Sequence, residues 1–573
     1  MLKTYSNKEG SVMASRQYER LSHEGRVLVD QTMEKLDPLY DPERGLVGMY
    51  YHSRRYYDNR SSMYYALALL LLDVPGCAEK AEKIIHTVIG TQIDAPEEIF
   101  HGVYRHDGAP VPAAGVLDYR RLGLYGRYFA DCFYERLADS FRLKLKHDPD
   151  LADHAGRIEA LLRSALFEST PVVWETYEPN SREFILMCLA MLLEHFESRL
   201  SPAAVRRMEQ SARLALAGAV ERSRSGFTPL NTNIQCMHVF ELDYFGVRLQ
   251  IPEYREYALQ YARGMLERYR EFHAAAEFNS PTYCSVDLST LGFWRRYGSC
   301  EELQQLGAEL EEGIWRDMMA FYNPALRNFC GPYSRAYELD HSIHTGFNAM
   351  LYWALGEEKY PCHDWSIESD SNPLMVLGSV RIPPDAQAAV FAPKEDVDIC
   401  RRFRELSERG DPDHNDALCT ATAWITPELM IGALAGSENP SYQLHPLVIF
   451  WRCGTGIGTL KLLRCWPDGG MHHMHTVYFN GTVKKSHVDM DIRTDVNRDV
   501  LYFFEIECPG AAGSGISPDL WRLPGLTLRL QADAPAPRVE NVSKNVIRIC
   551  FLAEAEKPET MRMHFSLNAE FTG

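Results

Sequence analysis

The stretch "AAAEFNSPTYCSVDLSTL", residues 274–291, shows how the N-terminal part of the chain is built. A long helical pattern ends just before it, a turn follows around Pro281, and an apolar helix then begins with Asp287 near its start. Glu277, Asn279 and Tyr283 stand between the two helices. This pattern predicts a hairpin of an outer and an inner helix, with polar and aromatic side chains collected at the entrance of the inner one.

The same alternation recurs from the N-terminus to about residue 357. Stretches such as "AAVRRMEQSARLALAGAVERS", residues 203–223, have one apolar stripe and a charged face, as outer helices do. Stretches such as "REFILMCLAMLLEHF", residues 182–196, are apolar on nearly every side, as inner helices are. Repeated hairpins of this kind predict an (α/α)6-type toroid. A helical solenoid is the alternative, but the sequence has no fixed-period repeat to support it.

After about residue 372 the sequence changes to short β-rich runs that are separated by Gly, Pro and Asp/Asn turns. Asn480-Gly481 predicts a type I′ hairpin turn, and residues 395–410 predict one helix that links the domains or packs on the sheet. We therefore expect an antiparallel β-sandwich. The predicted domains are an α/α toroid over residues 1–365 and an antiparallel β-sandwich over residues 366–573.

The composition, 46% hydrophobic and 24% charged, is that of a soluble globular protein. The net charge of −18 argues against a nucleic-acid partner, which would need a basic face. The N-terminal residues lack the apolar core of a secretory signal, and the longest apolar run, residues 64–74, is too short to span a bilayer. The 14 Cys include no C-x-x-C pair. These features predict a cytoplasmic protein with reduced cysteines and no membrane partner, and they are compatible with a homodimer.

Polar and aromatic residues concentrate just before five of the predicted inner helices. In a toroid of hairpins all inner helices run the same way, so these segments should meet at one rim. Free N–H groups and the positive ends of helix dipoles favour anions there. The alternative is that the individual polar residues are only helix caps. The five segments are residues 56–62, 174–183, 228–235, 277–287 and 331–344.

Such a rim has the groups needed to remove a proton alpha to a uronate carboxylate. That reaction needs Asn, His or Arg to neutralise the carboxylate, a base for the C5 proton and an acid for the leaving oxygen at C4. A Tyr can be the base if a nearby cation lowers its pKa from about 10. The catalytic candidates are Tyr283, Tyr333, His238, Arg335 and Glu277. His238 also fits a hydrogen-bonded core histidine.

Further side chains of the rim are candidates for binding the sugar. Amide and guanidinium groups supply hydrogen bonds, and aromatic rings offer stacking surfaces for sugar rings. Asp287 either caps its helix or binds a sugar hydroxyl. The substrate-binding candidates are Asn231, Asn233, Asn279, Asp287, Trp174, Tyr177, Tyr337, His341, Arg60 and, from the β domain, His473.

The β domain contains clustered histidines. On a strand, His473 and His475 share one face, and they either reach over the toroid rim or face solvent. No third ligand with clear spacing accompanies them, so we predict no catalytic metal. Residues 487–495 fit a polar exposed strand face better than a calcium site. We therefore expect no cofactor apart from an optional structural divalent cation.

An α-helical toroid with Asn, His, Tyr and Arg at the inner-helix entrances, followed by a β-sandwich, resembles the heparinase II/III and alginate lyase group of polysaccharide lyases. The resemblance implies a lyase that degrades an anionic, uronate-containing oligosaccharide or polysaccharide by β-elimination. The residues that it implies are Asn233 and His238 as neutralisers, Tyr283 or Tyr333 as base and acid, Arg335 in support, and His473 from the β domain. The sequence departs from many such lyases because its Asn and His are not contiguous.

An inverting glycoside hydrolase on the same toroid is the competing enzyme. It would use Glu277, Asp287 or Asp340 as general acid and base, with carboxyl groups about 6.5–9.5 Å apart. The acidic residues of the rim support this alternative, whereas the Tyr, Arg and His content supports a lyase. A carbohydrate isomerase or epimerase and a non-catalytic carbohydrate-binding protein are further alternatives.

Overall fold

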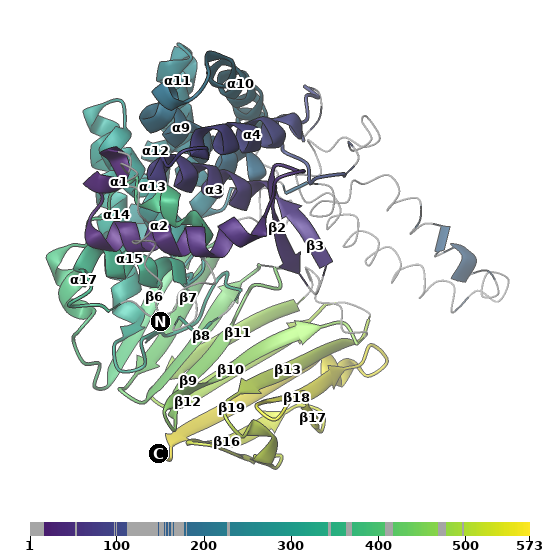
Figure 1. Ribbon diagram of the computed structural model, residues 1–573. Coiled ribbons are helices and arrows are strands. Elements are labelled where there is room, and N and C mark those ends of the chain that lie inside the picture. Colours follow the sequence, from purple (N-terminus) through teal and green to yellow (C-terminus); the bar gives the residue numbers. More distant parts are fainter. Residues whose placement is uncertain are drawn as a thin grey trace.

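The computed structural model describes residues 16–573 with gaps. The largest gap covers most of residues 112–176, and shorter ones include 52–53, 226–229, 342–344, 362–368, 407–415, 468–476 and 496–497. Trp174 and His473, two of the predicted binding residues, lie outside the described residues. Helices form the first part of the chain and strands the last, and Figure 1 shows the helices grouped on one side of a large sheet.

The described N-terminal part is built mainly of helices. The longer ones are α2 (His23–Leu36), α3 (Asn59–Leu72), α4 (Cys77–Gly90), α9 (Ser181–Phe196), α10 (Pro202–Ser225), α11 (Thr232–Arg248), α12 (Pro252–Phe272), α13 (Cys284–Tyr297), α14 (Glu301–Phe321) and α15 (Thr345–Leu355). Three shorter ones are α1 (Arg16–Arg20), α16 (Asn372–Met375) and α17 (Pro384–Ala389).

These helices pack as hairpins of one inner and one outer helix. Helix α3 packs on α4, α9 on α10, α11 on α12, and α13 on α14, while α3, α9, α11 and α13 contact one another in sequence. Nearly every residue of α9 is buried, whereas α12 buries only the stripe formed by Ala258, Ala262, Leu266 and Tyr269. The predicted alternation of apolar inner helices and amphipathic outer helices is confirmed, and with it the toroid-type helical part of the fold.

A small antiparallel sheet leads into the first inner helix. Its strands are β1 (Tyr40–Asp41), β2 (Leu46–Tyr51) and β3 (Arg54–Asp58). Asp58, the last residue of β3, caps α3 because its Oδ2 accepts a hydrogen bond from Ser61 N at 2.6 Å. The strand therefore ends where the helix begins, which places Tyr56 and Asp58 beside the entrance of α3.

The described residues of the C-terminal part form one antiparallel sheet of 14 strands. The strands are β6 (Val397–Arg404), β7 (Leu418–Ile425), β8 (Leu429–Ser437), β9 (Leu447–Cys453), β10 (Gly456–Cys465), β11 (Val477–Lys484), β12 (His487–Thr494), β13 (Val500–Glu507), β14 (Gly515–Ile516), β15 (Leu520–Leu523), β16 (Leu526–Asp533), β17 (Arg538–Asn541), β18 (Val546–Ala553) and β19 (Arg562–Phe571). Their main order is β14-β15-β16-β19-β12-β11-β8-β9-β10-β13-β18-β17, and β7 joins β6 to β8.

Aromatic contacts show that this sheet folds back on itself as a sandwich. Strands β13 and β19 are about six strand spacings apart along the sheet, roughly 29 Å if it were flat. The rings of Phe504 on β13 and Phe565 on β19 are nevertheless 5.3 Å apart between centroids. Phe504 also lies 5.2 Å from Trp521 on β15, and Phe551 lies 4.9 Å from Phe565. The two halves of the sheet therefore face each other across a shared apolar core.

Two local predictions within this domain are wrong. Half of the predicted helix at residues 395–410 is occupied by strand β6, which pairs along its whole length with β7. The predicted turn at Asn480-Gly481 lies in the middle of β11, and the chain turns instead after Lys484, with Lys485 at a positive φ of 53°. Gly481 makes room for its cross-strand partner, because a Cβ there would lie 2.3 Å from Met490 Cε.

The two parts of the chain are joined by segments that belong to both. Helices α16 and α17 pack on α2, α3 and α14, and the first strand of the large sheet begins at Val397. The β-bridge between Tyr333 and His445 connects the loop before α15 to the segment before β9. None of the described helices combines the length and the apolarity that a bilayer span requires.

Candidate active site

A cavity of about 690 Å³ lies where the inner helices begin, next to the β domain. All five of the predicted entrance segments contribute lining residues, so these segments meet at one rim as the toroid requires. They are joined by residues 370–375 before and within α16 and by residues 441–443 between β8 and β9. The volume is in the usual range for a small-molecule or oligosaccharide site, about 300–1,000 Å³.

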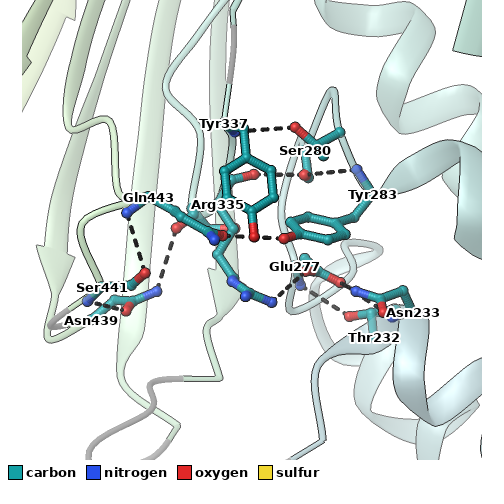
Figure 2. A network of polar contacts seen from close by, with 12 residues as sticks. Thr232, Asn233, Glu277, Ser280, Tyr283, Arg335, Tyr337, Asn439, Ser441 and Gln443 are labelled. Atoms are coloured by element: carbon teal, nitrogen blue, oxygen red, sulfur yellow. Dashed lines mark hydrogen bonds and ion pairs between the residues drawn. The ribbon is translucent and has the colours of Figure 1, made fainter. Parts of the chain in front are cut away.

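Glu277 is the centre of the polar network beside this cavity (Figure 2). Its Oε1 accepts a hydrogen bond from Arg335 Nη1 at 2.9 Å, and its Oε2 accepts from Asn233 Nδ2 at 2.8 Å and from Asn233 N at 3.2 Å. Its own backbone N donates to Thr232 Oγ1 at 3.0 Å. Glu277 is buried while Asn233 and Arg335 line the cavity, so the carboxylate holds two lining side chains in place.

The charge state of Glu277 is set by opposing effects. Burial raises its pKa above the usual value, and the Arg335 charge and the hydrogen bonds from Asn233 and Arg335 lower it again. Three N–H donors converge on its two oxygens, which is the arrangement that suits the ionised carboxylate. Arg335 and Glu277 therefore form an almost fully desolvated ion pair, with side chains 10% and 1% exposed.

Tyr283 stands at the start of α13 with its ring against Arg335. The guanidinium carbon of Arg335 lies 4.8 Å from the ring centroid, and the Tyr283 hydroxyl donates to Gln443 Oε1 at 3.3 Å. Ser280 positions both residues, because its Oγ accepts from Tyr283 N at 3.2 Å and donates to Arg335 O at 2.6 Å. Tyr283 thus presents a phenol to the cavity beside a fixed cation.

Burial raises the pKa of the Tyr283 phenol well above its usual value, and the Arg335 charge works against that rise. The phenol is therefore neutral at physiological pH, which suits a proton donor. Its use as a base requires the phenolate, and Arg335 is the group that favours this form.

The β domain supplies Gln443, which the sequence analysis missed. Asn439 Nδ2 donates to Ser334 O at 3.3 Å, Ser441 N donates to Asn439 Oδ1 at 2.9 Å, and Gln443 N donates to Ser441 Oγ at 3.2 Å. This ladder fixes the segment between β8 and β9 against the helical part. The available signal was the polar "SENPSYQ" run, residues 437–443, which is too long for a tight hairpin turn.

A second arginine, Arg60, also lines the cavity. Arg60 forms an ion pair with Glu178, and its guanidinium lies 3.5 Å from the centroid of the Phe184 ring. Two exposed aromatic side chains also line the cavity, Tyr56 at 42% and Tyr337 at 49% exposure. The ring of Tyr337 lies 6.0 Å from that of Tyr283, so a stacking surface adjoins the phenol.

His238 and Tyr333 do not reach the cavity, which corrects two of the catalytic expectations. His238 is fully buried and faces the outer helices, where its Nε2 contacts Ser223 Oγ at 3.1 Å and its ring meets Tyr261 edge-on. Burial lowers the pKa of His238 to about 3, so it stays neutral. Tyr333 is fully buried, and its hydroxyl donates to the backbone oxygen of Phe329.

Tyr177 and His341 also belong to the core. Tyr177 is fully buried in a small apolar cluster with Phe100. His341 is buried between aromatic rings, 4.5 Å from that of Phe329 and 6.1 Å from that of Phe347. Neither side chain lines the cavity.

Four predicted polar residues have structural positions instead of lining the cavity. Asn231 precedes α11, and its backbone oxygen accepts from Gln235 N. Asn279 donates from Nδ2 to Cys330 O at 2.7 Å and to Pro332 O at 3.1 Å. Asp340 accepts from Asn328 Nδ2 at 3.1 Å. Asp287 is completely buried, and burial together with Glu277 raises its pKa well above the usual value.

Among the described residues, no group of three or more His, Cys, Asp and Glu side chains is arranged to hold a metal ion. The described lining of the cavity supplies amide, phenol, guanidinium, carboxylate and hydroxyl groups, and one imidazole, that of His106, which the sequence analysis did not single out. These can bind an anion, donate and accept protons, and stack on sugar rings.

The chain belongs to the family described as "Domain of unknown function (DUF8769)", whose model matches residues 26–128 and 159–373. No curated protein matches the chain.

Among solved structures, the chain is similar to three polysaccharide lyases. A heparinase III is 9% identical with a TM-score of 0.34, covering 97% of this chain and 85% of its own. The heparan sulfate lyase HepC from Pedobacter heparinus is 10% identical with a TM-score of 0.29, covering 96% and 88%. The chondroitin AC lyase of Streptomyces coelicolor A3 is 11% identical with a TM-score of 0.36, covering 96% and 83%. At these values the likeness carries no conclusion about chemistry, which has to come from the cavity.

Proposed function

We propose that the protein is a lyase that cleaves a uronate-containing oligosaccharide or polysaccharide by β-elimination. The observation that carries this proposal is the phenol of Tyr283, held 4.8 Å from the Arg335 guanidinium in a cavity that Asn233 also lines. A phenol, a cation and an amide are the groups that the elimination needs, and the toroid brings them together from three separate segments.

In the proposed reaction, Arg335 and Asn233 hold the uronate carboxylate. Their charge and hydrogen bonds stabilise the enolate that forms when the C5 proton leaves. The C4–O4 bond then breaks, a C4–C5 double bond forms, and the leaving O4 takes up a proton, so no water is consumed. The Tyr283 phenolate takes the C5 proton, and the resulting phenol gives it to O4.

The carboxyl groups of the cavity are already engaged, which disfavours the competing hydrolase. Asp287 and Asp340 do not line the cavity, and Glu277 is paired with Arg335. Among the described lining residues, Asp58 caps α3 and Glu178 pairs with Arg60. A third lining carboxylate, Asp370, pairs with Lys35. An inverting hydrolase needs two carboxyl groups free to act on the sugar and a water molecule.

The test is a screen of uronate-containing oligosaccharides with ultraviolet absorbance and product mass recorded together. An absorbing product whose mass shows no added water establishes β-elimination. A product heavier by one water, without absorbance, would establish hydrolysis and overturn the proposal. Binding without any product would make the protein a carbohydrate-binding protein and would also overturn it.

A further inference from the structure

A second cavity, of about 280 Å³, lies on the outer side of the helical ring. It is enclosed by the outer helices α12 and α14 and the inner helices α11 and α13, all of which are labelled in Figure 1. It shares no lining residue with the larger cavity. Its lining includes the buried residues Thr232, Cys236, Ala276 and Leu291.

The walls of this cavity are largely apolar, and their tyrosine hydroxyls already have partners. Gln235 Nε2 donates to the hydroxyl of Tyr261 at 3.4 Å, and the hydroxyl of Tyr269 donates to Asp317 Oδ2 at 3.2 Å. These tyrosines would therefore contact a ligand mainly through their rings and less through their hydroxyl groups. Leu310 and Ile314 complete the apolar part of the lining.

Arg268 on α12 gives the cavity a positive end. Its Nη1 is buried and has no hydrogen-bond acceptor among the described residues. Its Nη2 is 3.9 Å from the nearest carboxylate oxygen, that of Asp416, which is beyond hydrogen-bonding distance. Among the described residues that line the cavity, none is an Asp or a Glu. A buried guanidinium N–H without an acceptor is costly, so an anionic group from a ligand would satisfy it.

We propose that this cavity binds a small organic monoanion with one apolar ring, its carboxylate on Arg268 and its ring against the tyrosine and aliphatic walls. The volume holds about nine water molecules at about 30 Å³ each, which is the size of a single substituted ring. A polyanion is disfavoured, because the described lining residues include no cation besides Arg268.

The position of this site connects it to Glu277. Thr232 and Ala276 line the cavity, and Thr232 Oγ1 accepts the hydrogen bond from Glu277 N at 3.0 Å. A bound ring would therefore contact Thr232, which accepts a hydrogen bond from Glu277, and Ala276, which precedes Glu277 in the chain. The binding itself does not depend on the proposed lyase activity and is measured without turnover.

The experiment is a calorimetric titration of the full-length protein with benzoate and, as the uncharged comparison, benzamide, each up to millimolar concentration. We expect saturable binding of benzoate and binding of benzamide that is about tenfold weaker or more, because the charge-assisted hydrogen bonds to Arg268 are lost. No saturable binding of benzoate, or equal binding of the two probes, would overturn the proposal.

Three variants locate the binding site. Arg268→Gln should weaken benzoate binding about tenfold or more and leave benzamide binding unchanged. Gly264→Met should block both probes, because Gly264 lines the cavity and a Cβ there meets no atom within 4 Å. Methionine also favours the helix over glycine, so this variant should remain folded. Arg270→Gln is the matched control, since Arg270 on the same helix pairs with Glu309 outside the cavity. Benzoate binding that survives the first two substitutions, or is lost in the control, would place the probe elsewhere and overturn the proposal.

Discussion

Replacing Glu277 by Gln tests whether the buried ion pair holds the proposed site together. The two oxygens of Glu277 face three donors, Arg335 Nη1 at 2.9 Å and two N–H groups of Asn233 at 2.8 and 3.2 Å. A glutamine has one acceptor oxygen, so its NH₂ group must face a donor whichever way the amide is turned. Arg335, with a side chain only 10% exposed, is then left without its counter-ion.

The expected cost follows from these contacts. Breaking a buried ion pair by removing one partner costs about 3–5 kcal/mol, and leaving a buried donor unsatisfied accounts for part of it. Because burial raises the pKa of Glu277, the carboxylate is less favoured than an exposed one, so we expect the lower end of that range. Chemical denaturation followed by far-ultraviolet circular dichroism measures this loss, and the product screen measures turnover.

Glu311→Gln is the matched control. Glu311 is also buried and also faces three donors, Arg295 Nε at 2.8 Å, Arg295 Nη2 at 3.3 Å and Arg381 N at 2.8 Å, but it does not line the cavity. Both variants should lose similar stability, and only Glu277→Gln should lose turnover. Unchanged stability of Glu277→Gln, or an equal loss of turnover in Glu311→Gln, would refute the reasoning.

Four further substitutions test the site. Tyr283→Phe removes a hydroxyl whose hydrogen bond is 3.3 Å long, so it should cost about 1 kcal/mol of stability but about 100-fold or more in turnover. Tyr333→Phe should keep full turnover in the same assay, and the opposite result would exchange the roles of the two tyrosines. Gln443→Glu places a carboxylate against the Tyr283 hydroxyl, which favours the neutral phenol; the alkaline rise of the pH–rate profile should therefore move to higher pH, and an unmoved profile would contradict a phenolate base. Burial raises the pKa of Asp287 well above its usual value, so the folded state prefers the protonated acid. The stability from this preference is present below the unfolded pKa of about 3.9 and is lost as pH rises toward the folded pKa. We therefore compare the unfolding midpoints of Asp287→Asn and the wild-type protein at neutral pH and at about pH 4. The stability of the variant relative to the wild type should be higher at neutral pH than at about pH 4. If the two proteins show the same pH dependence, this account of Asp287 is wrong.

The sequence predicts the elements of this fold wherever periodicity and burial agree. The apolar inner helix Ser181–Phe196 and the amphipathic outer helix Pro252–Phe272 are both found as expected. The sequence predicts a helix where strand Val397–Arg404 lies, because this strand pairs with only one neighbour, is largely exposed and lacks the apolar alternation of a central strand. Gly481 predicts a turn, but the structure needs a glycine there for a different reason. The absence of a side chain makes room for the cross-strand partner Met490.

For the candidate site, the sequence predicts the segments better than the individual side chains. Asn233 and Met237 lie one turn apart on α11 and line the cavity. His238 is five residues after Asn233, which turns it about 140° around the helix toward the outer layer. Which face of a buried helix meets the cavity depends on the packing of the whole ring, and a helix that is apolar on every side carries no local signal of it.

The contribution of the β domain could not be predicted for a related reason. Gln443 contacts a hydroxyl 160 positions earlier in the chain, so no local pattern connects the two. The contact depends on the ladder from Ser334 through Asn439 and Ser441, which crosses from the helical part to the sheet. The phenol of Tyr283 therefore has its cation from the helical part and its hydrogen-bond acceptor from the β domain. The toroid alone would keep the Glu277 ion pair and lose that acceptor, so the geometry proposed for proton transfer exists only when the two parts are packed together.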